Sequence, residues 1–224
     1  IGLVPHRLKI GEGNGVFRMM EALKASKPGE IDIIALGPLT NLALAIRLDK
    51  EAVKKAGRIV CMGSAGLGVG NATPLAEFNI WQDAEAAKIV VDAGIEQLVL
   101  VGWDACLGDA MLIPSEIDEI QKSGPLGKFA IDCNRQLMVL NTERFGDSYL
   151  AMADPSAMAA ALYPDCIETC DKYFCEVDIS NGPGYGNVIV DRCNVTGKEP
   201  NVYICSKLYA NKFKHYMYKT LRVC

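Results

Sequence analysis

The chain has 224 residues, half of them hydrophobic, and a formal net charge of −4 with acidic and basic residues interspersed. This length and apolar content suffice for one continuous core, so residues 1–224 are expected to form a single domain. The mixed charge excludes a nucleic-acid-binding surface, and charges interrupt every apolar run before it reaches the length of a membrane span, so neither nucleic acid nor membrane is an expected partner.

Short apolar runs alternate with helix-period segments in the first half of the chain. The runs 31–36, 58–62 and 97–101 are nearly continuous in apolar residues, as strands of a parallel sheet covered on both faces must be. Segments 39–56 and 83–93 carry apolar residues at three- and four-residue spacing and predict helices. The pattern predicts an α/β fold with a mostly parallel central sheet and helices on both faces.

Boundary residues accompany the two predicted helices. Thr40 or Asn41 can cap the first helix, Asp83 can cap the second, and Gly94 is suited to end it. The second half of the chain is less regular, with a turn at 181–186. Its predicted elements are helices at 126–140, 155–162 and 207–222 and strands at 174–179, 188–191 and 202–205.

The usage of cysteine indicates a reducing compartment. The nine cysteines are odd in number and lie mostly in apolar contexts, and no secretory leader opens the sequence. We therefore expect a cytoplasmic protein without a disulfide framework. Five cysteines of the second half have spacings that match no zinc motif, which disfavours a structural metal there: Cys166, Cys170, Cys175, Cys193 and Cys205.

In open α/β sheets, ligands bind beyond the carboxyl ends of the strands, so the segments after Leu36, Met62 and Gly102 are candidates for a site. The glycine-rich segment 62–71 lacks the spacing of a dinucleotide or nucleoside triphosphate loop. After Gly102 comes Trp103, for which core packing is favoured over stacking on a base.

Polar side chains follow the glycine-rich segment. Asn71, Glu77 and Asn79 combine a carboxylate with two amides, which suits a polyhydroxylated ligand such as a sugar. The alternative is that the asparagines serve turns and that Glu77 is solvated, and composition alone favours this alternative. Trp81, nearby, is expected to pack in the core.

Several segments, taken in order, resemble the signature blocks of inosine-uridine-preferring nucleoside hydrolases. They are Gly-Pro-Leu-Thr-Asn-Leu-Ala at 37–43, Met-Gly at 62–63, Gly-Asn at 70–71, Ala-Glu-Phe-Asn-Ile-Trp at 76–81 followed by Asp83, and Met-Ala-Asp-Pro-Ser-Ala-Met-Ala at 152–159. The resemblance implies hydrolysis of the N-glycosidic bond of ribonucleosides to free base and ribose. It also implies a calcium ion that orients and acidifies the attacking water.

The resemblance also implies roles for individual residues. Those matching Asn71, Glu77 and Asn79 hold the ribose hydroxyls, and those matching Met62 and Phe78 contribute around the sugar. For Met62, a place in the core is an equally good interpretation.

For the metal, the resemblance implies that the backbone carbonyl of Leu36 and the carboxylate of Asp154 are calcium ligands. Family members open with an aspartate-rich D-x-D-x-x-x-D-D segment, which supplies the other carboxylate ligands and the general base. We expect this segment to be absent from the chain, because segment 11–15 offers one carboxylate and the wrong spacing. No catalytic base is therefore assigned, and Ala153 stands where many members have a histidine.

Loss of the first strand would leave a sheet edge unpaired, so we expect another segment to pair there or a homodimer or homotetramer to form. Two functions remain open at this stage. The first is a nucleoside hydrolase that acts in nucleoside salvage, and the second is an inactive nucleoside- or ribose-binding protein of the same fold. A structural or interaction module is a weaker third.

Overall fold

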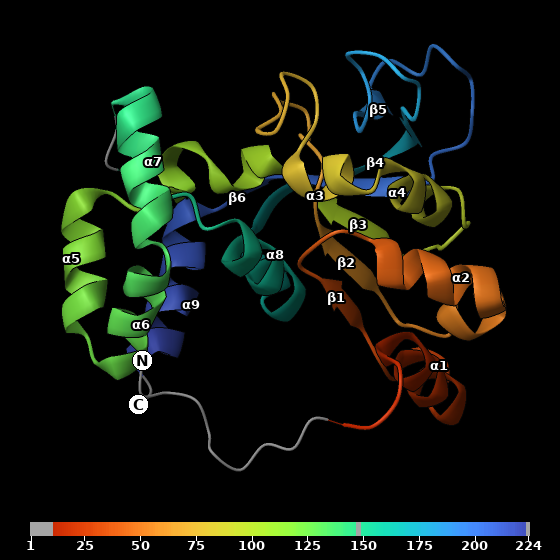
Figure 1. Cartoon of the computed structure of the whole chain (residues 1–224), viewed down its shortest axis with the longest axis horizontal. Helices are drawn as coiled ribbons and strands as arrows, with labels where there is room; N and C mark the ends of the chain where they lie inside the picture. Colours follow the sequence, from red (N-terminus) through yellow and green to blue (C-terminus); the bar gives the residue numbers. More distant parts are fainter. Residues whose placement is uncertain (1–10, 147–148, 223–224) are drawn as a thin grey trace.

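The computed structural model describes residues 11–146 and 149–222. A six-stranded sheet runs through them in the order β1-β2-β3-β6-β4-β5 (Figure 1). The strands are β1 (Ile33–Ala35), β2 (Ile59–Met62), β3 (Leu98–Val101), β4 (Ile167–Val177), β5 (Val188–Asp191) and β6 (Val202–Leu208). The first three strands and β6 pair in parallel, whereas β4 pairs antiparallel with β6 and β5. The mostly parallel α/β sheet expected from the sequence is confirmed.

Helices cover both faces of this sheet, as predicted (Figure 1). Residues of α1, α2 and α4 share one buried cluster with the sheet, and residues of α5, α6, α8 and α9 share a second. The helices are α1 (Gly15–Ala25), α2 (Thr40–Val53), α3 (Phe78–Gln82), α4 (Ala84–Val91), α5 (Pro114–Lys122), α6 (Pro125–Cys133), α7 (Arg135–Phe145), α8 (Ala153–Leu162) and α9 (Ala210–Arg222).

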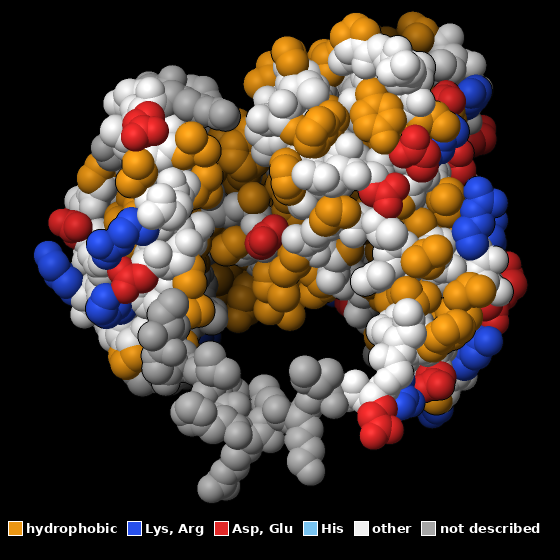
Figure 2. All heavy atoms as spheres, in the orientation of Figure 1, with side chains coloured by type: hydrophobic (Ala, Val, Ile, Leu, Met, Phe, Trp, Pro, Cys, Tyr) orange, Lys and Arg blue, Asp and Glu red, His pale blue; other side chains and the backbone are white. Residues whose placement is uncertain are grey.

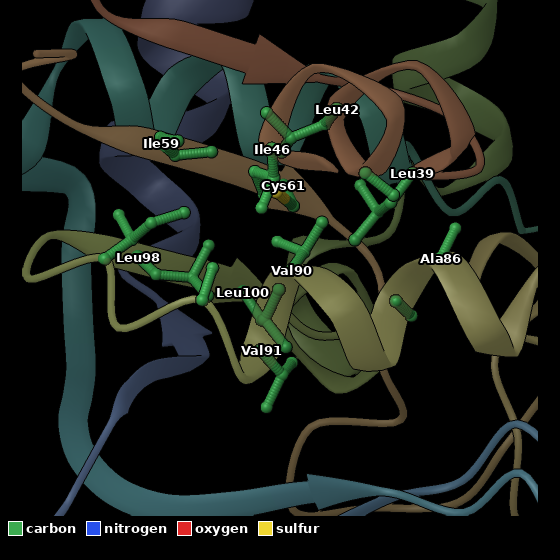
Figure 3. Close-up of a cluster of buried hydrophobic side chains, with 14 of the residues drawn as sticks. Leu39, Leu42, Ile46, Ile59, Cys61, Ala86, Val90, Val91, Leu98 and Leu100 are labelled. Atoms are coloured by element: carbon green, nitrogen blue, oxygen red, sulfur yellow. The ribbon is translucent and has the colours of Figure 1, made fainter. Parts of the chain in front are cut away.

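Strand β2, which has a strand on each side, shows why the apolar runs are continuous. All four of its residues are buried, and they alternate between the two clusters. Ile59 and Cys61 face α2 and α4, where Leu42 and Val90 meet them (Figure 3), while Val60 and Met62 face α8 and α9. Each large aliphatic side chain buried in this way stabilises the fold by roughly 1.5–3 kcal/mol.

The predicted capping residue of α4 is confirmed, whereas the one predicted for α2 is wrong. Asp83 caps α4 by accepting a 3.0 Å hydrogen bond from the backbone N–H of Ala86, and Gly94 follows the helix with a φ of 65°. The N-cap of α2 is Leu39, which makes no side-chain capping bond. Thr40 instead donates its hydroxyl to Asp83, because the two helix starts lie side by side.

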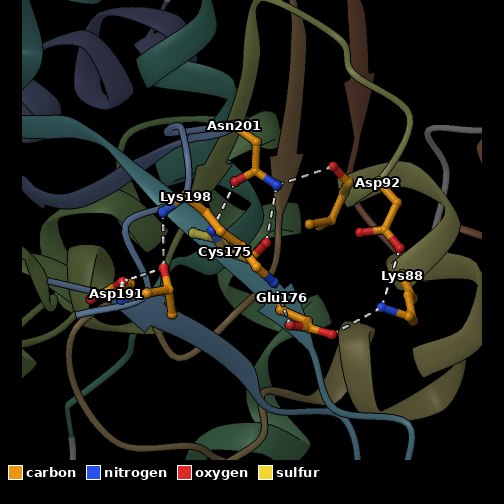
Figure 4. Close-up of polar contacts among 9 residues, drawn as sticks. Lys88, Asp92, Cys175, Glu176, Asp191, Lys198 and Asn201 are labelled. Carbon is orange, nitrogen blue, oxygen red and sulfur yellow. Dashed lines mark hydrogen bonds and ion pairs between the residues drawn. The ribbon is translucent and has the colours of Figure 1, made fainter. Parts of the chain in front are cut away.

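Asn201 anchors the start of β6 to the neighbouring strand β4. Its Oδ1 accepts from the backbone N–H of Cys175 at 2.7 Å, and its Nδ2 donates to the carbonyl oxygen of Cys175 at 3.0 Å (Figure 4). Lys88 of α4 reaches Glu176 of β4 at 3.4 Å on the same side. The Asn201 bonds thus join the two strands, and the Lys88–Glu176 ion pair joins β4 to α4.

Other boundaries differ from the predicted ones. Helices α1 and α5 were not expected, and the predicted helix 126–140 is divided into α6 and α7 at Asn134. Strand β4 begins at Ile167, seven residues before the predicted start at 174, because its first half pairs with β6. Strand β6 extends to Leu208, so α9 begins at Ala210 and not at 207. The turn at 181–186 is confirmed.

Strand β1 lies at one edge of the sheet, and its three residues are only partly buried. Among the described residues it pairs on one side only, with β2, so pairing of a further segment there stays a prediction, as does oligomerisation. A hollow lies between the group of helices α5, α6, α7 and α9 and the rest of the described molecule (Figure 2). No helix of the described residues is long and apolar enough to cross a membrane.

Candidate functional site

The candidate site forms where β2 and β3 end. The loop after β2 turns at Ser64, a buried residue with a φ of 78°. Its carbonyl oxygen accepts from the backbone N–H of Trp103, which follows β3, at 2.9 Å, and its Oγ accepts from the N–H of Gly66 at 3.0 Å. A positive φ at a residue other than glycine costs free energy and is concentrated at functional sites. The loops after the two strands are therefore held together.

Asn71 closes a compact turn that leads into α3. Its Oδ1 accepts from the backbone N–H of Phe78 at 2.8 Å, and its own N–H donates to the carbonyl oxygen of Ala76 at 3.1 Å. A Cβ at Gly70 would lie 2.3 Å from the carbonyl oxygen of Thr73, so only glycine fits the tight start of this turn. The structural role expected of Asn71 in a turn is confirmed.

Glu77 is the N-cap of α3 and is only 2% exposed. Both carboxylate oxygens lie 3.0 Å from the backbone N of Asn79, and Oε2 also accepts from Ile80 at 3.3 Å. Burial raises the pKa of Glu77, and the charge of Asp154 raises it further, while the N–H groups of Asn79, Ile80 and Ser64 oppose the shift. The expectation that Glu77 is solvated is wrong.

Asn79, in the first turn of α3, contacts the last residue of β2. Its Nδ2 donates to the carbonyl oxygen of Met62 at 3.1 Å and lies 3.2 Å from the Met62 sulfur. Met62 itself is buried in the core cluster under α8, which supports its interpretation as core. Phe78, by contrast, is 49% exposed beside these buried groups. The five residues predicted to surround a sugar are thus brought together at one strand end.

Trp81 is the correction in this segment. It was expected in the core, but it is 39% exposed. The backbone of Trp81 packs so tightly against Gly186 of the 181–186 turn that a Cβ at Gly186 would come within 2.8 Å of it. The backbone of Trp81 is therefore covered by this turn, while the residue as a whole stays partly exposed. Trp103 is half-buried and packs against the core, as favoured from the sequence.

The two predicted metal ligands line the same cavity. Leu36, at the end of β1, and Asp154, in the first turn of α8, both border an apolar cavity of about 350 Å³ between α8 and α9. Burial raises the pKa of Asp154. A carbonyl and a carboxylate are the oxygen donors that calcium prefers, but calcium takes about six to eight of them. No group of three or more His, Cys, Asp or Glu residues that could hold a metal occurs among residues 11–146 and 149–222, so these donors fit calcium in type but not in number.

Asp104 belongs to the site but was missed in the sequence. It follows β3 in the short 3-10 helix Trp103–Cys106, and its Oδ2 accepts from the backbone N–H of Leu67 in the glycine-rich loop at 2.8 Å. Its Oδ1 is buried without a hydrogen-bond partner. Burial raises the pKa of Asp104 to about 6. The signal for it in the sequence is a carboxylate three residues after the end of an apolar strand.

This carboxylate explains two glycines, Gly66 in the loop after β2 and Gly102 after β3. A Cβ at Gly66, whose φ is 67°, or at Gly102 would lie within 2.4 Å of Asp104 Oδ1. The charges of Asp104, Glu77 and Asp154 all add to burial in raising the pKa of Cys106 to about 12. The three carboxyl groups thus act electrostatically on one buried thiol, and the glycine-rich loop packs against one of them, Asp104.

Comparison with known proteins bears on what such a site does. The family model described as inosine-uridine preferring nucleoside hydrolase matches residues 4–215. A putative pyrimidine-specific ribonucleoside hydrolase RihB of Shigella dysenteriae is 35% identical over 187 residues, which cover 83% of this chain and 67% of the relative. The RihB of an Escherichia coli O1:K1 strain is 34% identical over 83% of this chain, and there the match spans 58% of the relative.

Solved structures of nucleoside hydrolases share the fold. A plant nucleoside hydrolase, PpNRh1, superposes with a TM-score of 0.84 at 25% identity, over 93% of this chain and 67% of its own. A purine-preferring ribonucleoside hydrolase from Gardnerella vaginalis superposes with a TM-score of 0.83 at 24% identity, over 97% of this chain and 69% of its own. The resemblance of the sequence blocks is thereby confirmed, and the chain belongs to the inosine-uridine-preferring nucleoside hydrolase family.

Proposed function

We propose that the protein hydrolyses the N-glycosidic bond of purine or pyrimidine ribonucleosides and releases free base and ribose. The observation that carries this proposal is the convergence of Asn71, Glu77 and Asn79 on one strand end, with both amides and the carboxylate fixed by backbone hydrogen bonds. Relatives named as ribonucleoside hydrolases support it. Because the chain spans 58–75% of the length of the first RihB relatives, the activity of the whole protein is part of the proposal.

The ribose is bound by the groups that the fold holds rigid. A carboxylate has about four lone-pair positions, so Glu77 can accept from a ribose hydroxyl in addition to the N–H groups of α3. Asn71 and Asn79 contribute amide groups on either side of it. Phe78, half exposed beside these groups, covers an apolar part of the nucleoside. The carbonyl oxygen of Met62 holds Asn79 in place by accepting its hydrogen bond.

Fixed hydrogen-bonding groups favour the reaction when they bind the transition state more tightly than the substrate. Cleavage of a glycosidic bond passes through an oxocarbenium-like state in which the sugar ring flattens. Amide and carboxylate groups held by α3 and by the 70–76 turn do not need to reorganise as the ring changes shape. The site residues therefore act by positioning the ribose.

Calcium is the proposed metal, with the Leu36 carbonyl and the Asp154 carboxylate as two of its ligands. The raised pKa of Asp154 fits a carboxyl in a poorly solvated site that a cation would stabilise in its charged form. Because the described residues supply two donors of the required type, no step of the reaction is assigned to the ion.

A second function is favoured by two observations. The described residues contain no cluster of three metal-binding side chains, and Ala153 cannot donate a proton to a leaving base. Both fit an inactive protein that binds a nucleoside or ribose through the same three residues. Such a protein would be stabilised by ribose in a thermal melt, with no effect of chelator and no turnover.

The assay that separates the two functions measures ribose released from inosine and from uridine as reducing sugar, with calcium or with chelator. Calcium-dependent release supports the hydrolase. A rise in melting temperature with ribose, without release from either nucleoside, supports the binding protein. If the protein neither releases ribose nor is stabilised by it, both proposed functions are contradicted.

Cell location and assembly are inferred from other features. The eight cysteines of the described residues are all free thiols, which supports a reducing, cytoplasmic location. A role in nucleoside salvage follows from the proposed hydrolysis. The β1 edge, paired on one side among the described residues, supports a homodimer or homotetramer. Light scattering of the purified protein tests the assembly, with a monomer mass as the contrary result.

A further inference from the structure

Two cysteines of the cluster that matched no zinc motif lie directly opposite each other in the sheet. Cys170 of β4 is the register partner of Cys205 of β6 in an antiparallel pair. Directly opposed residues in such a pair have Cα atoms about 4.5–5.5 Å apart. Disulfides span Cα separations of about 4.4–6.8 Å, so the backbone already holds these two residues at a suitable distance.

The two thiols also interact with each other. Hydrogen bonding to Cys205 lowers the pKa of Cys170, and the same bond, together with burial, raises the pKa of Cys205. Cys205 is fully buried, whereas Cys170 is partly exposed. The more acidic thiol is thus the one that solvent reaches, which is the arrangement of a reactive cysteine beside a resolving one.

Two other cysteines of the sheet have neither a cysteine opposite them nor a lowered pKa. Cys175 lies on the same strand, but its cross-strand partner is Val190, and burial raises its pKa to about 12. Cys61 is paired with Ala35 and Leu100, and burial raises its pKa to about 12 as well. Burial without a thiol partner makes these cysteines unreactive.

We propose that Cys170 and Cys205 form a redox modification site that closes to an intramolecular disulfide under hydroperoxides. The Cys170 thiolate attacks one oxygen of hydrogen peroxide, the O–O bond breaks, and hydroxide leaves and is protonated to water, giving a sulfenic acid. The Cys205 thiol then attacks this sulfur, the S–O bond breaks, and a second water leaves with the Cys205 proton. Each sulfur is oxidised, one peroxide is reduced to two waters, and a dithiol reductant reverses the change.

This inference does not depend on the proposed function. The disulfide would join β4 to β6, neighbouring strands on the antiparallel side of the sheet, and need not affect catalysis. Cys166, which lies just before β4 and is buried, is the competing partner, because its charge also raises the pKa of Cys205. The experiment must therefore tell Cys166 from Cys170.

Peptide mass mapping after peroxide treatment of the full chain makes this distinction. Trypsin separates the thiols into peptide 199–207 with Cys205, peptide 173–192 with Cys175, and peptide 145–172 with both Cys166 and Cys170. The expected product links 199–207 to 145–172, fragments to show the bond at Cys170, and disappears after dithiothreitol. Cys175 remains a free thiol in the same digest.

Matched variants complete the test. Cys170→Ser abolishes the link and Cys175→Ser on the same strand leaves it unchanged, provided that thermal melts of the reduced variants match the wild type. If Cys170→Ser fails to fold, Cys170→Ala replaces it, and the wild-type digest alone still identifies the bond. A bond at Cys166, or oxidation of Cys170 to sulfinic acid without a link to 199–207, would overturn the proposal.

Discussion

The carboxylate of Asp104 and the backbone N–H of Leu67 are joined by a 2.8 Å hydrogen bond that ties the turn after β3 to the glycine-rich loop after β2. Leu67 follows Gly66, where a Cβ would collide with this carboxylate, and Asn71 lies four residues beyond Leu67. The position of the proposed ribose-binding residues therefore depends on a side chain from a different strand end.

Replacing Asp104 by asparagine should change how stability depends on pH. The pKa of Asp104 is about 6 in the folded protein and ordinarily 3.8, so the folded state holds the proton more tightly than the unfolded state does. The stability that this proton contributes is present below the ordinary value and is lost as pH rises through about 6. In Asp104→Asn, the fall in unfolding free energy across this window should be smaller by about 1–2 kcal/mol, less than the full shift implies because the carboxyl is partly open to solvent.

Urea unfolding at several pH values measures this difference, and Asp109→Asn, an exposed residue close by in sequence, is the control. Parallel pH profiles of Asp104→Asn and the wild type would show that folding does not raise the pKa of Asp104. Asp104→Ala, which removes the bond to Leu67, should be less stable than Asp104→Asn at every pH.

Alanine at Gly70 should disrupt the site, whereas alanine at Gly68 should be tolerated. A Cβ at Gly70 would lie 2.3–2.5 Å from backbone atoms of Thr73 and Ala76, which form the turn around Asn71. A Cβ at Gly68 would lie no closer than 3.3 Å to any of its neighbours, the nearest of which is the Asp104 Cβ. The expected losses of unfolding free energy are about 2 kcal/mol or more for Gly70→Ala and under about 1 kcal/mol for Gly68→Ala. Thermal melts and ribose binding of the two variants test the contrast; equal effects would argue against a special role of the turn.

Asn79 should contribute to stability as well as to binding. Asn79→Ala leaves the buried carbonyl oxygen of Met62 without its donor, which should cost about 1–3 kcal/mol of unfolding free energy. Gln82→Ala, an exposed position at the end of the same helix, should cost under about 0.5 kcal/mol. Denaturant unfolding of both variants measures the gap. A stability of Asn79→Ala equal to that of Gln82→Ala would mean that the bond to Met62 is unimportant.

Asp154 should control the response to calcium. Asp154→Asn removes one of two proposed ligand groups and its charge, so the calcium concentration at half-maximal activity should rise at least about tenfold, which corresponds to about 1.4 kcal/mol. Asp165→Asn, an exposed carboxylate in the turn after α8, should leave that concentration unchanged. An unaltered calcium response in Asp154→Asn would remove it from the ligand set.

The parallel half of the fold was predictable because burial on both faces dictates its sequence. Strand β2 is apolar at all four positions since it faces a helical layer on each side, and Asp83 caps α4 by a local bond to Ala86. Strand β4 was half missed for the opposite reason. Its first half contains consecutive polar residues, Asp171 and Lys172, which interrupt the apolar pattern. This segment forms a strand through pairing with β6.

The site was predictable in part. The order of the blocks identified Asn71, Glu77 and Asn79, and these residues do lie at one strand end. Asp104 escaped prediction because its partner is a backbone N–H 37 residues away in sequence, which leaves no spacing to recognise. The core position predicted for Trp81 was wrong because local sequence cannot show how a distant turn packs. The 181–186 turn covers the backbone of Trp81 and leaves the residue partly exposed.

The most direct test of the proposed function compares kcat/KM for ribose release from inosine and uridine by the wild type and by Glu77→Gln, with calcium present. The wild type should release ribose, and Glu77→Gln should be slower by about 10–100-fold, because a hydrogen bond to a charged group contributes about 1.5–3 kcal/mol. Gln82→Ala should match the wild type. No release by the wild type, or equal rates for Glu77→Gln and the wild type, would contradict the assignment of this site to ribonucleoside hydrolysis.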